Sequence, residues 1–198
     1  MRAEAALAFA FAVAACGTGG ARPPCPSGTW PDEARERAIE ARLASVAEGR
    51  TLLDAQQDRV ARVCFASASS ASVVTHDRVV ILAQGLEEAE AAARLGHLLV
   101  HLRDGLPIDA VSASLAPAAC DAAVDRALAL EARAYVAEVA LQDELGAHPR
   151  MLAFEFGDAL RAASGDAREG IVLAYLREHP TGGQGIDGLA EAYRARCR

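Results

Sequence analysis

The chain has 198 residues, of which 52% are hydrophobic and 5% aromatic, and its 20 basic and 27 acidic side chains give a formal net charge of -7. A negative net charge disfavours contact with a phosphate backbone, so the composition argues against a nucleic-acid-binding protein. A chain of this length can bury one hydrophobic core unaided but is short for two full domains, so we expect a single domain.

An apolar run from Ala5 to Ala15 lies at the start of the chain. A helix of eleven residues reaches only about 17 Å, far short of the roughly 30 Å hydrocarbon core, so the run is not a membrane-spanning helix. Its length is typical of the apolar part of a signal peptide. The residues at its end, Val13-Ala14-Ala15-Cys16, resemble the bacterial lipobox, in which small residues precede a cysteine that is lipidated and becomes the mature N-terminus.

This resemblance implies a signal peptide over residues 1–15 and a lipid on Cys16 that anchors the protein to a membrane. The alternative is ordinary secretion, with cleavage after Ala14 or Ala15 and an unmodified Cys16. Both interpretations export the chain to the bacterial cell envelope. Gly17 stands where bacteria often use aspartate to retain a lipoprotein in the inner membrane, so the outer membrane is favoured, with the protein facing the periplasm or the cell surface.

Residues 16–29 are rich in Gly and Pro, which predicts a flexible tether between the lipid and the domain. Residues 30–198 remain for the single domain.

Four further cysteines, Cys25, Cys64, Cys120 and Cys197, form an even set in a chain that is sent to an oxidising compartment, which predicts two disulfides. Three pairings are possible. We favour Cys25 with Cys64 and Cys120 with Cys197, because the second bond would tie the end of the chain to a helix. The set contains no Cys-x-x-Cys, which argues against a zinc ribbon or a thioredoxin-like redox site.

The pattern of apolar residues predicts a small antiparallel sheet followed by a helical majority. A helix is expected from Asp32 to Ala47, ended by Glu48-Gly49-Arg50. Short β-branched runs predict strands at Val60–Ala66, Ser72–Thr75 and Arg78–Leu82, the last two as a hairpin. Further helices are expected over Glu87–Arg103, Ala118–Leu145, Arg150–Ala163, Ala167–Glu178 and Ile186–Arg196. This order of elements is typical of the α+β class.

Two histidines, His97 and His101, lie four residues apart on the helix expected over Glu87–Arg103. Residues at this spacing are about 40° apart around a helix, so their ring nitrogens can reach one metal ion. They lie beside the apolar stripe of the helix and not at its centre. The alternative is a solvated polar face with ion pairs such as Glu90 with Arg94.

Glu131 lies on a largely apolar face of the helix expected over Ala118–Leu145. Burying a carboxylate without a partner is costly, so such a residue is expected to bind a metal ion, a hydrogen-bond donor or an arginine. An ion pair with Arg94 or Arg126 is the alternative to a metal ion.

The segment from Val73 to Gly146 resembles a minimal zincin metallopeptidase domain. The resemblance lies in a hairpin, then a helix with His97 and His101, then Glu131-Ala132-Arg133-Ala134 on a later helix. Zincins carry His-Glu-x-x-His on the first helix and Glu-x-x-Ala or Glu-x-x-Asp on the later one. The resemblance thus implies a zinc site formed by His97, His101 and Glu131.

Leu98 stands where zincins carry their catalytic glutamate. That glutamate is the general base that takes a proton from the zinc-bound water, and a leucine cannot do this. We therefore expect no catalytic residues and a pseudoenzyme, an exported, lipid-anchored protein that acts as a binding or structural module for a peptide or protein partner. The alternatives are an active zinc metallopeptidase with an unconventional base, and a helical lipoprotein whose histidine pair is accidental.

Overall fold

Three short strands and a larger set of helices make up the computed structural model, which describes residues 22–56, 60, 62–67, 72–147, 154–179 and 188–198. In chain order the elements are α1 (Glu33–Ala44), α2 (Ala47–Gln56), β1 (Arg62–Ala66), β2 (Val73–Val74), β3 (Val79–Ala83), α3 (Glu88–Asp104), the 3-10 helix η1 (Pro107–Ala110), α4 (Pro117–Leu145), α5 (Phe154–Ala162), α6 (Ala167–Glu178) and α7 (Leu189–Arg196). The helix-rich α+β class with a small sheet is confirmed.

The sheet has the strand order β1-β3-β2, with β2 and β3 antiparallel as the predicted hairpin. The prediction of a wholly antiparallel sheet is wrong, because β1 pairs with β3 in parallel and the sheet is mixed. Almost every residue of β1 and β3 is buried, without alternation between buried and exposed positions. Strands covered on both faces show this continuous pattern, which is frequent in parallel pairs.

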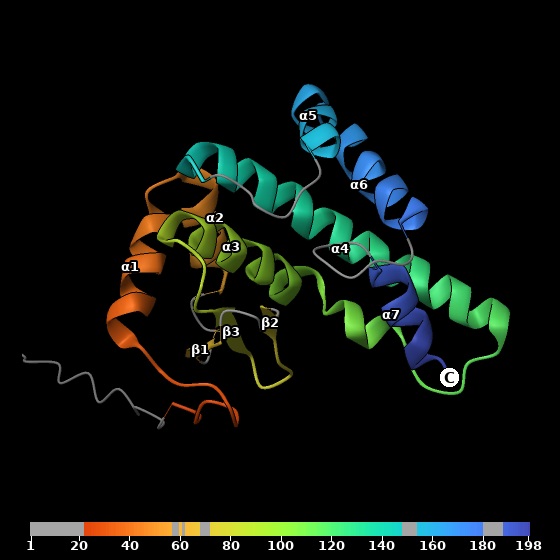
Figure 1. Cartoon of the computed structure of the whole chain (residues 1–198), viewed down its shortest axis with the longest axis horizontal. Helices are drawn as coiled ribbons and strands as arrows, with labels where there is room; N and C mark the ends of the chain where they lie inside the picture. Colours follow the sequence, from red (N-terminus) through yellow and green to blue (C-terminus); the bar gives the residue numbers. More distant parts are fainter. Residues whose placement is uncertain (1–21, 57–59, 61, 68–71, 148–153, 180–187) are drawn as a thin grey trace, which may run out of the picture.

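Helix α3 lies beside the sheet and between α1, α2 and α4, and together these elements enclose the larger hydrophobic core (Figure 1). A second core lies on the other side of α4, where η1, α6 and α7 pack against it. The long helix α4 therefore contributes to both cores, and the face that it turns toward α3 carries Glu131.

The end predicted for the first helix at Glu48-Gly49-Arg50 is wrong, because α1 ends at Ala44 and a second helix, α2, runs through these residues. Gly49 is buried inside α2, and a Cβ atom there would lie 2.0 Å from the carbonyl oxygen of Leu43. The glycine thus allows α2 to fold back closely onto the end of α1, and it does not stop a helix.

Both disulfides have the predicted pairing, Cys25 with Cys64 and Cys120 with Cys197. The first joins the segment before α1 to β1, and the second joins the residue after α7 to the first turn of α4. Cys16, the predicted site of lipidation, lies outside the described residues. Within those residues, no helix combines the length and the apolar character that crossing a membrane requires.

Candidate metal centre

The three predicted ligands come from two adjacent helices, His97 and His101 from α3 and Glu131 from α4. The first turn of α3 is closed by a capping box between Glu87 and Glu90, in which the backbone N–H of Glu87 donates to the Glu90 carboxylate at 3.1 Å. The apolar side of α3 then packs into the larger core. This arrangement turns the face with the two histidines toward α4.

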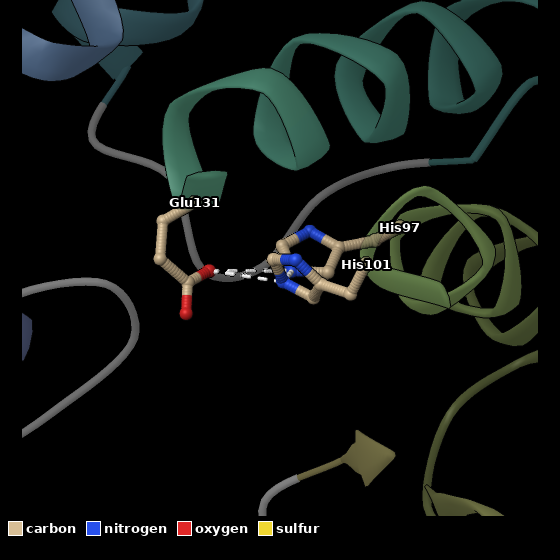
Figure 2. Close-up of side chains that lie close together, drawn as sticks. All are labelled: His97, His101 and Glu131. Atoms are coloured by element: carbon tan, nitrogen blue, oxygen red, sulfur yellow. Dashed lines mark hydrogen bonds and ion pairs between the residues drawn. The ribbon is translucent and has the colours of Figure 1, made fainter. Parts of the chain in front are cut away.

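The structure brings the three side chains together as the sequence predicts (Figure 2). The Nε2 atoms of His97 and His101 are 2.9 Å apart. Oε2 of Glu131 lies 3.4 Å from Nε2 of His97 and 3.3 Å from Nε2 of His101. All three residues are buried, with 3%, 4% and 7% of their surfaces exposed for His97, His101 and Glu131.

These distances fit one metal ion. Ligand atoms about 2.1 Å from a tetrahedrally coordinated zinc ion lie about 3.4 Å from one another. The two nitrogen-to-oxygen distances, 3.4 and 3.3 Å, match this value, and the 2.9 Å between the nitrogens is about half an ångström shorter. The buried group of His97, His101 and Glu131 could therefore hold a metal ion.

Two of the alternatives left open by the sequence, a solvated face and an ion pair of Glu131 with Arg94, do not describe this site, whereas Glu131 does meet a hydrogen-bond donor, the hydroxyl of Tyr193. The histidines are buried and not on a solvated face, because that face of α3 is covered by α4. Arg94 forms its ion pair with Glu138 and not with Glu131, at 3.0 Å. A pattern read along one helix does not include the helix that packs on it, so burial of the pair was not predictable from α3 alone.

Glu138 is a neighbour of the candidate site that the sequence did not single out. Its Oε2 lies 2.9 Å from Nδ1 of His97, on the side of the ring away from Glu131, and its Oε1 meets Arg94. The amide of Gln142 donates to Glu138 at 3.3 Å. A carboxylate behind a metal-binding histidine fixes the ring and its tautomer. The signal was present in the sequence, because Glu138 follows Glu131 by two helical turns and lies on the same face.

Two tyrosines complete the surroundings of the ligands. The ring of Tyr135 packs edge-on against the ring of His97, with 4.6 Å between centroids, and the guanidinium of Arg94 lies over Tyr135 at 5.8 Å. The hydroxyl of Tyr193, on α7, donates to Oε1 of Glu131 at 2.5 Å. Tyr193 is 62 residues from Glu131 and no pattern in the sequence pointed to it.

Opposite charges balance inside the centre. Burial alone would raise the pKa of Glu131, but its contacts with His101 and His97 outweigh burial and hold the pKa well below its usual range. Burial is likewise outweighed at Glu138, where Arg94 and His97 lower the pKa. Both groups are therefore carboxylates at neutral pH.

The two histidines differ in their pKa values. Burial lowers the pKa of His101, which favours its neutral form. Burial also acts against a charge on His97, but its contacts with Glu131 and Glu138 prevail and raise its pKa. The raised pKa of His97 favours its charged form, which together with Arg94 offsets the charges of the two carboxylates in this buried group.

Leu98 is 3% exposed and packs in the larger core with residues of the sheet and of α1 and α2. Among the described residues, no fourth His, Cys, Asp or Glu side chain joins the ligand group. Glu138 is already engaged by His97 and Arg94. Neither Leu98 nor Glu138 is therefore placed as a general base for a metal-bound water.

Comparison of the chain with models of protein families, with curated proteins and with solved structures finds no match in any of the three. The geometry of the three ligands and their neighbours alone carries the assignment of a candidate metal centre.

Proposed function

We propose that this protein is a zinc-binding, non-hydrolytic module of the bacterial cell envelope, with a zincin-like site that binds a peptide or protein partner. The observation that carries the proposal is the convergence of three buried ligand atoms, from His97, His101 and Glu131, with both nitrogen-to-oxygen distances as expected around one tetrahedral ion.

Zinc is the metal that this set of ligands favours. Two imidazole nitrogens and one carboxylate oxygen are a common set for zinc in proteins, whereas magnesium and calcium prefer sites made of oxygen atoms alone. Three protein ligands fill three of four tetrahedral positions. The fourth would be left to water, or to a carboxylate, carbonyl or imidazole group of a partner that reaches the buried ligands.

The leucine at position 98, where zincins carry their general base, supports a non-hydrolytic role. General acid–base help contributes about 100-fold to 10,000-fold to rates of hydrolysis. Leu98 cannot give this help, and its side chain is packed into the core. Zinc in this site would still polarise a bound carbonyl group, but the chain offers no described carboxylate to take the proton from an attacking water.

The place in the cell envelope rests on the sequence around Cys16 and is supported by the two disulfides, because such bonds persist in oxidising compartments. Metabolic labelling with a fatty acid analogue tests the anchor. We expect label in the wild type and none in Cys16→Ala. A Cys16→Ala protein that still carries the label would refute lipidation at this residue.

Metal content tests the zinc site. We expect about one equivalent of zinc in the purified wild type and a loss of zinc in His97→Ala and in Glu131→Ala. His76→Ala is the matched control, because His76 has a largely exposed side chain and lies outside the ligand group. A wild type that neither carries nor takes up zinc would overturn the proposed metal site.

Peptide cleavage tests the non-hydrolytic role. We expect the zinc-loaded wild type to leave a mixture of peptides intact. Cleavage by the wild type that is blocked by a chelator and lost in His97→Ala would overturn the role as a binding module. It would instead favour an active metallopeptidase with an unconventional base.

A further inference from the structure

The hydroxyl of Tyr193 occupies one oxygen of the Glu131 carboxylate and leaves the other to the histidines. It donates to Oε1, whereas the contacts with His97 and His101 are both made by Oε2. The phenol O–H is the donor in this contact, and the carboxylate oxygen accepts. With Oε1 held in this way, Glu131 presents a single oxygen to a metal ion.

Tyr193 lies on α7, a helix of eight residues that ends at the Cys120–Cys197 disulfide. An isolated helix of this length is marginally stable in water, so α7 depends on its attachments. Its ion pairs, such as Arg194 with Asp121 and Arg198 with Glu191, are between exposed groups and contribute little. The disulfide joins the C-terminal end of α7 covalently to the first turn of α4.

The spacing of the residues connects the disulfide to the metal site. Tyr193 and Cys197 are four residues apart, so they project from the same face of α7. Cys120 and Glu131 are eleven residues apart, about three helical turns, so they share one face of α4. The disulfide between Cys120 and Cys197 and the hydrogen bond between Tyr193 and Glu131 both join these two faces.

We propose that the Cys120–Cys197 disulfide acts through Tyr193 as part of the metal site, by holding the phenol against Glu131 so that this ligand binds zinc through Oε2 alone. Tyr193 is then a positioning residue for a ligand, and the C-terminal disulfide sets the affinity for the metal. The inference rests on the proposed zinc site and adds the means by which that site is supported.

Zinc affinity, measured by competition with a chromophoric chelator, tests the proposal. We expect Tyr193→Phe and the double variant Cys120→Ser/Cys197→Ser each to weaken zinc binding by about 10-fold or more, the range seen when the partner of a metal ligand is removed. If the disulfide acts through Tyr193, the triple variant Tyr193→Phe/Cys120→Ser/Cys197→Ser should have about the zinc affinity of whichever of these two variants binds zinc less tightly.

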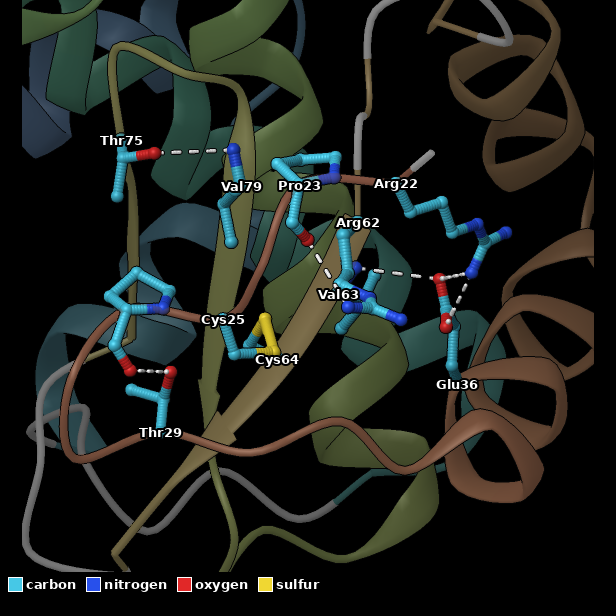
Figure 3. Close-up of a disulfide and its surroundings, with 11 residues drawn as sticks. Arg22, Pro23, Cys25, Thr29, Glu36, Arg62, Val63, Cys64, Thr75 and Val79 are labelled. Carbon is cyan, nitrogen blue, oxygen red and sulfur yellow. Dashed lines mark hydrogen bonds and ion pairs between the residues drawn. A yellow bond between two sulfur atoms is a disulfide. The ribbon is translucent and has the colours of Figure 1, made fainter. Parts of the chain in front are cut away.

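The second disulfide of the chain gives the matched control. Cys25 and Cys64 are joined by a disulfide (Figure 3). They belong to a separate cluster of side chains with Ala66, Val79 and Ile81. The Cys25→Ser/Cys64→Ser variant should therefore keep the zinc affinity of the wild type while losing a cross-link. This comparison separates support of the metal site from the general stabilisation that any disulfide gives.

Cobalt substituted for zinc gives a readout of the coordination itself. We expect the visible absorption bands of the Co²⁺ protein to shift in Tyr193→Phe, because release of Oε1 changes how Glu131 binds the ion. Unchanged bands together with unchanged zinc affinity in Tyr193→Phe would overturn the inference, and this variant keeps both the disulfide and the ring. A wild type that binds no metal would instead overturn the proposed function itself.

Discussion

The Nδ1 atom of His97 lies 2.9 Å from Oε2 of Glu138, and the other oxygen of this carboxylate lies 3.0 Å from the guanidinium of Arg94. A carboxylate in this position keeps a proton on Nδ1, so that Nε2 is the ring nitrogen that faces Glu131. The orientation of one metal ligand on α3 thus depends on a residue of α4 that is not itself a ligand.

Replacing Glu138 by Gln should weaken zinc binding by about 10-fold or more, because the neutral amide no longer stabilises the Nδ1–H of His97. Competition with a chromophoric chelator measures the change. Glu144→Gln is the matched control, since Glu144 lies on the same helix but is exposed, and its zinc affinity should equal that of the wild type. Equal affinities for both variants would contradict the role assigned to Glu138.

Zinc binding should weaken as the pH falls. The pKa of His97 is raised, so its Nε2 is more often protonated near neutral pH than in an ordinary histidine, and zinc must displace this proton. Affinity should therefore rise with pH until His97 is neutral in the free protein. Isothermal titration in two buffers of different ionisation enthalpy measures the proton release. A binding enthalpy that does not depend on the buffer would contradict this linkage.

Leu98 should behave as a core residue. Its side chain is 3% exposed within the larger core, so Leu98→Ala should lower the free energy of unfolding by about 2–5 kcal/mol. Leu98→Met keeps most of the volume and should cost less than about 1.5 kcal/mol. Urea denaturation measures both. A loss below about 1 kcal/mol in Leu98→Ala would show that the side chain does not fill the core.

Gly49 and Gly170 should respond in opposite ways to alanine. A Cβ atom at Gly49 would meet the carbonyl oxygen of Leu43, so Gly49→Ala should lower the free energy of unfolding by about 1–3 kcal/mol. At Gly170, inside α6, a Cβ atom meets nothing within 4 Å, and alanine should stabilise the protein by about 0.5–1 kcal/mol. Thermal unfolding compares the two, and a stabilising Gly49→Ala would refute the close contact of α1 with α2.

Local patterns in the sequence were sufficient for most of the helices and for the three ligands. The helix Ala167–Glu178 has the predicted bounds, and His97, His101 and Glu131 meet because each follows a helical period that the sequence displays. The disulfide pairing followed from the need to tie the end of the chain to a helix. These features depend on residues close together in the sequence or on few possible combinations.

Features that depend on contacts between distant segments were not predictable. The parallel pairing of β1 with β3 depends on how the strands are arranged in the folded sheet. The sequence of a short buried strand does not encode its neighbour or its direction. Gly49 has the sequence signature of a helix stop, and only the position of Leu43 shows why a glycine lies inside α2. Tyr193 reaches Glu131 from another helix, so no spacing within one element could reveal it.

The two disulfides decide how this chain would carry a mechanical load. Figure 3 shows Cys25 bonded to Cys64, so a pull on the chain before Cys25 enters β1 directly and α1 and α2 lie in an unloaded loop. The Cys120–Cys197 bond likewise unloads nearly all of α4 together with α5 to α7. Tension between the two ends would therefore stretch only the segment from Cys64 to Cys120. His97 and His101 lie in that segment, and Glu131 does not. A metal ion bound by all three would therefore connect the stretched segment to the part of α4 that carries Glu131, which bears no load.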